Sequence, residues 1–220
     1  MQQNKRVVVL LSGNGSNLQA MIDQNPAYSY KLVAVLSNRP EALGLERARQ
    51  HNIPALTLDH TTFPDRETFD LQLIKEIDNF KPDLVVLAGY MRILSTAFVK
   101  HYENRLINIH PSLLPDYKGM HTYRRVLEDQ QKQHGTTVHY VTPELDSGAQ
   151  LLQASLTINP ADTEDSLRRR VQAMEHQIYP LAVHLITSGR LTIKDSIAYF
   201  DNKPLSPQGY QLREHALEIR

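Results

Sequence analysis

The sequence predicts an α/β fold built on a doubly wound, mostly parallel sheet with a partly antiparallel C-terminal part. Apolar runs of strand length alternate with stretches of helical pattern over the first half of the chain. These runs are continuously apolar, as expected of strands that helices cover on both faces. Beyond Pro115 the alternation gives way to two β-rich runs joined by a turn-rich segment, which predicts the antiparallel part.

The predicted elements alternate along the chain. Strands are expected at residues 7–11, 32–36, 55–58, 84–88 and 106–109. Helical patterns lie between them, near residues 17–23, 43–51, 66–80 and 96–102. A short helix near 122–130 precedes the β-rich runs 136–141 and 149–158. Because ligands of such sheets bind beyond the carboxyl ends of the strands, a site is expected there.

The last third of the chain predicts one long helix and a tail. Asp162 can cap the helix, and six apolar residues then recur at spacings of three and four. They are Leu167, Val171, Met174, Ile178, Leu181 and Leu185. Pro180 lies inside this pattern, so a kink or a break is expected near Gln177. We expect a single domain over 1–220, with a core at about 7–200 and an extended tail at 201–220.

Composition excludes several classes of protein. Lys and Arg total 24 and Asp and Glu also total 24, so the formal charge is zero and nothing predicts a nucleic-acid or anionic-membrane partner. The absence of Cys removes thiolate catalysis, disulfides and Cys-based zinc sites, and suits the cytoplasm. No apolar run reaches the length of a signal peptide core or a membrane span. We therefore expect a cytoplasmic protein with small-molecule substrates, as a monomer or a homodimer.

A glycine-rich turn separates the first strand from the first helix. Its residues are Gly13, Asn14, Gly15, Ser16 and Asn17. Backbone N–H groups and the helix dipole at such a turn favour an anion. The third glycine of a dinucleotide fingerprint and the lysine of a P-loop are both missing, so no nicotinamide cofactor is expected. The turn suits a single phosphate, with a tight turn that binds nothing as the alternative.

Asn108 and His110 end an apolar run, and a strand would place both side chains on one face. His110 could be a metal ligand, a structural histidine or a catalytic group. His101 and His121 do not stand at ligand spacing from it, so no metal is expected. Asp146, in a later loop, could meet the imidazole and favour its protonated form. An amide, an imidazolium and a carboxylate suit acyl transfer to an amine. Since no Gly-x-Ser-x-Gly or Cys nucleophile occurs, direct attack by a substrate amine is the simpler scheme.

Two further segments are candidates for binding. An apolar stretch follows the fourth strand and either packs against helices or lines the cleft of a flat heterocycle. It consists of Met91, Arg92, Ile93 and Leu94. Gln172 and Glu175 share a flank of the long helix beside its apolar stripe. A solvated charge is the ordinary interpretation of such a glutamate.

Five motifs together resemble the folate-dependent formyltransferase family, in the branch that formylates glycinamide ribonucleotide. They are GNGSN at 13–17, MRIL at 91–94, NIHPSLLPDYKGMH at 108–121, HGTTVH at 134–139 and ELDSG at 144–148. The motifs occur in the family's order, and the likeness covers about residues 7–210. The resemblance implies a Rossmann-like fold. It also implies formyl transfer from the cosubstrate 10-formyltetrahydrofolate to the amino group of glycinamide ribonucleotide in purine synthesis, without a metal.

The resemblance also implies roles for individual residues. Asn108, His110 and Asp146 match the catalytic trio, in which the amide and the protonated imidazole stabilise the oxyanion and the carboxylate keeps the imidazole charged. The ribonucleotide side is matched by Gly13, Asn14, Gly15, Ser16, Asn17, Gln172 and Glu175. The folate side is matched by Arg66, Met91, Arg92, Ile93, Leu94, Asn108 and Leu145.

Two departures and three alternatives accompany this resemblance. Tyr123 stands where the family pattern has a second histidine, and Ser147 replaces a glycine beside Asp146, so loop shape and folate fit are in question. One alternative is a formyltetrahydrofolate deformylase, expected to carry an additional N-terminal domain. Another is a methionyl-tRNA formyltransferase, expected to carry a basic C-terminal domain. The third is a ribonucleotide-binding module without catalysis. Zero net charge and the short segments outside the core favour the ribonucleotide branch.

Overall fold

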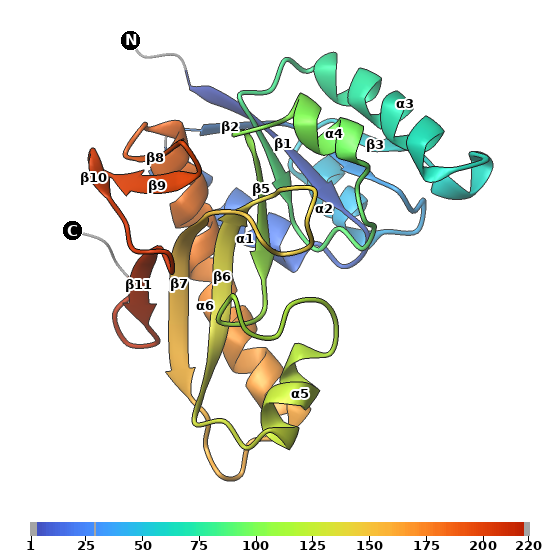
Figure 1. Cartoon of the computed structure of the whole chain (residues 1–220). Helices are drawn as coiled ribbons and strands as arrows, with labels where there is room; N and C mark the ends of the chain where they lie inside the picture. The colour runs from blue at the N-terminus through green and yellow to red at the C-terminus, as the bar shows by residue number, and fades with distance from the viewer. Residues whose placement is uncertain (1–3, 29, 218–220) are drawn as a thin grey trace. The chain divides into compact units, whose positions relative to one another are not determined.

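The computed structural model describes residues 4–28 and 30–217 and has the predicted α/β architecture (Figure 1). A mostly parallel central sheet is accompanied by a small antiparallel sheet. The chain forms two compact units. One comprises the residues up to Asn108 with Val141–Pro143, and the other comprises Ile109–Tyr140 with the residues from Glu144 onward. The single domain expected from the sequence stays a prediction.

The first unit is built on parallel strands in the order β5-β4-β1-β2-β3. The strands are β1 (Lys5–Leu11), β2 (Tyr30–Ser37), β3 (Ala55–Thr57), β4 (Leu84–Leu87) and β5 (Leu106–His110). Most residues of β1, β2 and β4 are buried, which explains why their sequences show no polar alternation. The strand order reverses between β1 and β4. In sheets of this kind ligands bind at such a reversal, so the loops that follow β1 and β4 are favoured positions for a site.

Four α-helices and two short 3-10 helices connect these strands. They are α1 (Ser16–Gln24), η1 (Asn25–Ala27), α2 (Leu43–Gln50), η2 (His60–Thr62), α3 (Arg66–Asp78) and α4 (Thr96–His101). Side-chain caps begin the last two α-helices, because Asp65 accepts the Thr68 N–H at 2.7 Å and Ser95 accepts the Phe98 N–H at 3.3 Å. The α-helices coincide with the predicted helical stretches to within two residues at each end.

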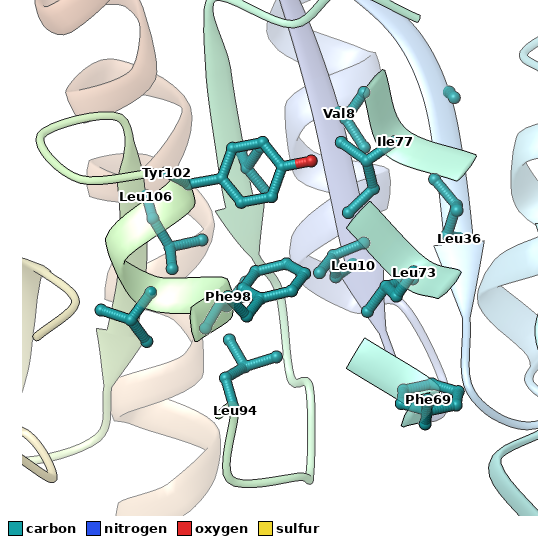
Figure 2. Close-up of a cluster of buried hydrophobic side chains, with 14 of the residues drawn as sticks. Val8, Leu10, Leu36, Phe69, Leu73, Ile77, Leu94, Phe98, Tyr102 and Leu106 are labelled. Carbon is teal, nitrogen blue, oxygen red and sulfur yellow. The ribbon is translucent and has the colours of Figure 1, made fainter. Parts of the chain in front are cut away.

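A buried apolar cluster holds α3 and α4 on one face of this sheet (Figure 2). The helices contribute Phe69, Leu73, Ile77 and Phe98, Tyr102 directly after α4 joins them, and the strands contribute Val8, Leu10, Leu36 and Leu106. Loss of either phenylalanine ring would cost about 3–5 kcal/mol of stability. Leu11 follows Leu10 and so points to the opposite face, where a Cβ placed on Gly44 of α2 would come within 2.4 Å of the Leu11 side chain. Helices therefore cover both faces, as a doubly wound sheet requires.

The second unit contains the predicted antiparallel part. β6 (Gln133–Tyr140) and β7 (Gln150–Thr157) pair antiparallel, and β11 (Tyr210–Arg213) adds to β7 in parallel. A separate antiparallel sheet is formed by β8 (Leu191–Lys194), β9 (Ile197–Phe200) and β10 (Lys203–Pro204). Two helices, α5 (Thr122–Glu128) and α6 (Glu164–Thr187), contact each other, and α6 also packs on β6, β7 and β8.

Helix α6 differs from its prediction at its N-cap and around Pro180. Its N-cap is Thr163, which accepts the Ser166 N–H at 3.2 Å, and Asp162 instead accepts the Ser166 hydroxyl at 2.8 Å. Of the kink or break predicted near Gln177, the break is wrong, because the helix continues through the buried Pro180, and the kink stays a prediction. Five of the six predicted stripe residues are buried. The exception is Leu181, since Ala182 and Val183 take the buried face after the proline.

The C-terminal tail is more ordered than predicted. Residues 203–204 pair with β9, and residues 210–213 extend the sheet beside β7, so these parts of the tail form hydrogen-bonded strands. Arg170 of α6 anchors the region after β11 through the Glu214 carboxylate at 3.0 Å. Within residues 4–28 and 30–217, no helix has both the length and the apolarity needed to cross a membrane.

Candidate active site

The glycine-rich loop after β1 is shaped by its backbone. Gly15 is the N-cap residue of α1 with φ of 73°, a left-handed conformation that favours glycine. A Cβ there would also lie 2.6 Å from the Gly44 Cα, so the two glycines permit a close approach of α2 to the loop. No side chain caps α1 and its first turn holds no acidic residue. The phosphate-binding role that the sequence predicts for this loop stays a prediction.

The buried Ser12 connects this loop to the loop after β4. Its hydroxyl donates to Asn38 Oδ1 at 2.6 Å and accepts the Met91 N–H at 2.8 Å, while its own N–H donates to the Gly89 carbonyl at 3.1 Å. The sequence alone did not indicate a role for Ser12 or Asn38. Both are buried polar residues, and the hydrogen bonds of Ser12 to Gly89 and Met91 fix the start of the loops after β1 and β4.

The segment after β4 is partly packed and partly exposed, and its predicted role in lining the cleft of a flat heterocycle stays a prediction. Leu94 is buried in the apolar cluster, whereas the side chains of Met91 and Ile93 are largely exposed. The Arg92 guanidinium lies over the Phe69 ring, 4.9 Å from its centroid. Burial raises the pKa of Asp70 on the neighbouring helix, while its hydrogen bonds to Ser95 and the charge of Arg92 oppose this rise. The segment therefore presents two exposed apolar side chains on a firmly packed base.

Arg66 is the first residue of α3 and is exposed. Its guanidinium pairs with the carboxylate of Glu67 at 2.9 Å. An anionic ligand would have to compete with that carboxylate, so the folate role carried over to Arg66 stays a prediction.

His110 meets Asp146 in the second unit, as the sequence predicts. Nδ1 of His110 lies 3.5 Å from Asp146 Oδ2, and the side chains are only 8% and 7% exposed. Nε2 lies 2.9 Å from the Tyr117 carbonyl. Both ring nitrogens thus face oxygen atoms that can accept a hydrogen bond. Asn108 precedes His110 by two positions in β5, and its place in the catalytic trio stays a prediction.

The Asp146 loop is held by the segment that follows β5. Asp146 adopts φ of 47°, and its Oδ2 accepts the Gly119 N–H at 2.9 Å. Lys118 hydrogen-bonds the Ser147 hydroxyl and lies 3.9 Å from the Glu144 carboxylate. Ser147, which replaces the family's glycine, thus has a local partner. Leu145 at the tip of this loop is 53% exposed.

Two buried histidines near His110, His134 and His139, were not predicted from the sequence as individual site residues. His139 Nε2 lies 3.8 Å from Asp146 Oδ1, and burial lowers the pKa of His139 to about 4. Burial and the charge of His110 likewise lower the pKa of His134 to about 4. Near neutral pH, His139 and His134 are therefore both uncharged. The repeated histidines of the HGTTVH motif were the available sequence signal.

His134 also explains the first departure from the family pattern. Its ring donates to the Pro111 carbonyl and packs edge-on against Tyr123, 5.5 Å between centroids. Its Nε2 has no hydrogen-bond partner among the residues that the structure describes. Tyr123 therefore fills space beside a neutral, buried histidine.

Glu175 is buried, so its interpretation as a solvated helix-edge charge is wrong. Thr136 Oγ1 lies 3.4 Å from its carboxylate and 3.0 Å from the His110 carbonyl. Burial raises the pKa values of Tyr123 and Tyr179, and the Glu175 carboxylate raises both further. Gln172 is half-buried on the same helix. In the described part of the chain, no group of three or more His, Asp and Glu side chains is placed to hold a metal ion.

Comparison with known proteins agrees with this architecture. The model of the formyl transferase family matches residues 5–183. Phosphoribosylglycinamide formyltransferase of Escherichia coli (strain K12) is 52% identical over 94% of this chain and 99% of that protein. Its counterpart in Haemophilus influenzae is 42% identical over 94% and 98% of the two chains. The solved structure of phosphoribosylglycinamide formyltransferase from Coxiella burnetii superimposes with a TM-score of 0.92 at 46% identity, covering 94% of this chain and 99% of that one. The chain therefore belongs to the formyl transferase family, among the phosphoribosylglycinamide formyltransferases.

Proposed function

We propose that this protein transfers a formyl group from 10-formyltetrahydrofolate to the amino group of glycinamide ribonucleotide, in purine biosynthesis. The observation that carries the proposal is the buried His110–Asp146 pair, at 3.5 Å, within a chain of this family. Both substrates are small molecules, and we place the reaction in the cytoplasm.

The reaction proceeds by direct attack of the substrate amine on the formyl carbon. A C–N bond forms, and the formyl oxygen becomes an oxyanion in a tetrahedral intermediate. The intermediate collapses with cleavage of the bond to N10 of the folate, which gains a proton while the attacking nitrogen loses one. No covalent bond to the protein is formed, which agrees with the absence of Cys and of a serine nucleophile motif.

The protein's part in this reaction is electrostatic. We assign the oxyanion to the His110 imidazolium and the Asn108 amide, which strand β5 directs to one side. Asp146 supports the charged imidazole through Nδ1. The Nε2–H, which donates to the Tyr117 carbonyl, is the donor that turns to the oxyanion when it forms. His139 is neutral near pH 7, so it does not compete with His110 for the Asp146 charge.

Binding is assigned to the remaining candidates. Gly13 to Asn17 would hold the ribonucleotide phosphate through backbone N–H groups, and Gln172 and Glu175 would approach the ribonucleotide. The exposed side chains of Met91, Ile93 and Leu145 would contact the folate ring system. Arg66 and Arg92 would serve the anionic end of the folate. These assignments rest on the family resemblance and on the exposure of the side chains.

The experiment that tests this function follows the fate of the formyl group. The purified protein is incubated with glycinamide ribonucleotide and formyl-labelled 10-formyltetrahydrofolate, and mass spectrometry locates the label. Label on the ribonucleotide, absent without protein, is the expected result. Label released as formate with or without the ribonucleotide would indicate a deformylase. No turnover would leave a ribonucleotide-binding module.

A further inference from the structure

Arg47 of α2 hydrogen-bonds Asn14 of the glycine-rich loop and Gln19 of α1 through the three nitrogens of its guanidinium group. Nε donates to the Asn14 carbonyl at 2.8 Å, Nη2 donates to Asn14 Oδ1 at 2.9 Å, and Nη1 donates to Gln19 Oε1 at 3.2 Å. The planar fork of an arginine suits such a set of acceptors, because one side chain fixes several of them at once. Arg47 therefore holds both the backbone and the side chain of Asn14, an exposed loop residue.

The start of α2 is placed to bring Arg47 to the loop. The Gly44 N–H donates to the Gly13 carbonyl at 3.0 Å. The Cα atoms of Gly44 and Gly15 approach closely, because neither residue has a side chain to separate them. Arg47 follows Gly44 by three residues on the helix and so lies near the same face. Gly15 of the loop and Gly44 and Arg47 of α2 thus hold the loop and the helix together.

The charge of Arg47 is not compensated by a carboxylate. All three of its hydrogen-bond acceptors are neutral, and no Asp or Glu in the described part of the chain lies within ion-pair distance of it. By contrast, Arg49 on the same helix lies 3.7 Å from the Glu46 carboxylate. The first turn of α1 also lacks an acidic residue. Arg47 thus has hydrogen-bond acceptors but no carboxylate to compensate its charge. Its positive charge therefore favours an anion beside the loop.

We propose that Arg47 acts on the phosphate of the acceptor in two ways, as a positioning residue that fixes the loop and as the positive charge next to it. The inference rests on the proposed function, in which this loop holds the ribonucleotide phosphate. Arg47 thereby contributes to the choice of a phosphorylated acceptor over an uncharged one. It does not touch the reacting atoms, so it acts on binding and leaves turnover at saturation unchanged.

The test compares Arg47→Gln and Arg47→Lys with the matched control Arg49→Gln. Binding of inorganic phosphate is followed through the NMR shifts of the loop amides at low and high salt. The KM values for glycinamide ribonucleotide and for the formyl donor are measured separately, together with the rate on the dephosphorylated acceptor. Arg47→Gln should weaken phosphate binding and raise the ribonucleotide KM about tenfold, a loss reduced by salt. Arg47→Lys keeps the charge without the fork and should recover about a third of the affinity.

The readouts separate this role from a merely structural one. The donor KM and the rate on the dephosphorylated acceptor should stay within about twofold in all variants, and Arg49→Gln should match the unmodified protein. Equal phosphate affinity in Arg47→Gln and Arg49→Gln would overturn the inference, as would an equal loss on the dephosphorylated acceptor. Because phosphate binding needs no catalysis, it can fall in Arg47→Gln even if no formyl transfer is found. The absence of formyl transfer would refute the proposed function. The lower phosphate affinity of Arg47→Gln would still support the role of Arg47 in phosphate binding.

Discussion

The glycine-rich loop and the His110–Asp146 pair are built in opposite ways. The loop is exposed at Gly13 and Asn14, and it offers mainly backbone N–H groups shaped by the left-handed Gly15. The pair is buried and consists of titratable side chains that come from segments 36 residues apart in the chain. An exposed backbone loop suits binding of an anion, whereas a buried charged pair suits stabilisation of charge that develops during the reaction.

This difference predicts which kinetic parameter each region controls. A group that interacts equally with the ground state and the transition state changes KM, and a group whose interaction strengthens in the transition state changes kcat. We therefore expect variants of the loop to change the ribonucleotide KM and variants of the pair to change turnover.

The largest effect is expected for Asp146→Asn. The amide cannot compensate the charge of His110, so kcat should fall about 100-fold or more while both KM values change little. Steady-state kinetics with both substrates varied measures this. Asp165→Asn, an exposed residue in the first turn of α6 paired with Arg168, is the control and should keep full turnover. Unchanged kcat in Asp146→Asn would remove the carboxylate from the mechanism.

A smaller effect, of a different kind, is expected for Gly15→Ala. Alanine at φ of 73° costs about 1–2 kcal/mol, and its methyl carbon would lie 2.6 Å from the Gly44 Cα. The loop must shift, so the ribonucleotide KM should rise about tenfold with kcat and the donor KM nearly unchanged. Gly13→Ala is the matched control for backbone shape, because a Cβ there meets nothing within 4 Å. A lower kcat of Gly15→Ala without a change in the ribonucleotide KM would contradict the expectation that the loop controls binding.

The burial of His134 predicts an acid-sensitive second unit. Its pKa is about 4 in the folded state against about 6.5 when unfolded, so the unfolded chain binds more protons between these values. The free energy of unfolding should therefore fall as pH drops from 6.5 to 4, by on the order of 2–3 kcal/mol from this group. Denaturant unfolding at pH 7 and pH 4.5 measures it. His134→Asn should show a smaller difference between the two pH values, and an equal difference would contradict the prediction.

The smallest effect is expected for Leu145→Ala. The side chain is 53% exposed, so its loss should change stability by no more than about 0.5 kcal/mol. If Leu145 contacts the folate, the donor KM should rise about threefold and the ribonucleotide KM should not change. Leu71→Ala on α3, also 53% exposed, is the control and should leave both KM values as they are. Equal donor KM values in the two variants would remove Leu145 from the folate side.

The same comparison explains what could be predicted from the sequence. The strands of the first unit could be read from apolar runs because burial on both faces leaves a continuous pattern. The glycine-rich loop could be read because its conformation is determined by residues adjacent in the chain. Asp146 required a pairing across distant segments, and the acyl-transfer residue types together with the family resemblance indicated it.

What the sequence did not predict depends on tertiary contacts. Glu175 carries no local sign of burial, since it is covered by tertiary packing, with Thr136 of β6 at 3.4 Å from its carboxylate. The pairing of β11 with β7 was hidden because prolines and a glycine precede it, and a parallel edge strand has no local partner. Thr163 and Asp162 both suit an N-cap, so only the hydrogen bonds distinguish them. The hydrogen bond from Arg47 to Asn14 likewise joins residues 33 positions apart in the chain.

The most direct test is the single-turnover rate of formyl transfer at saturating concentrations of both substrates, for the unmodified protein, Asp146→Asn and Gly15→Ala. Saturation removes differences in binding, so this rate reports the chemical step alone. We expect Asp146→Asn to be slower by about 100-fold or more and Gly15→Ala to transfer the formyl group at the unmodified rate. A slow Gly15→Ala beside an unimpaired Asp146→Asn would contradict the division between a loop that binds and a buried pair that carries the chemistry.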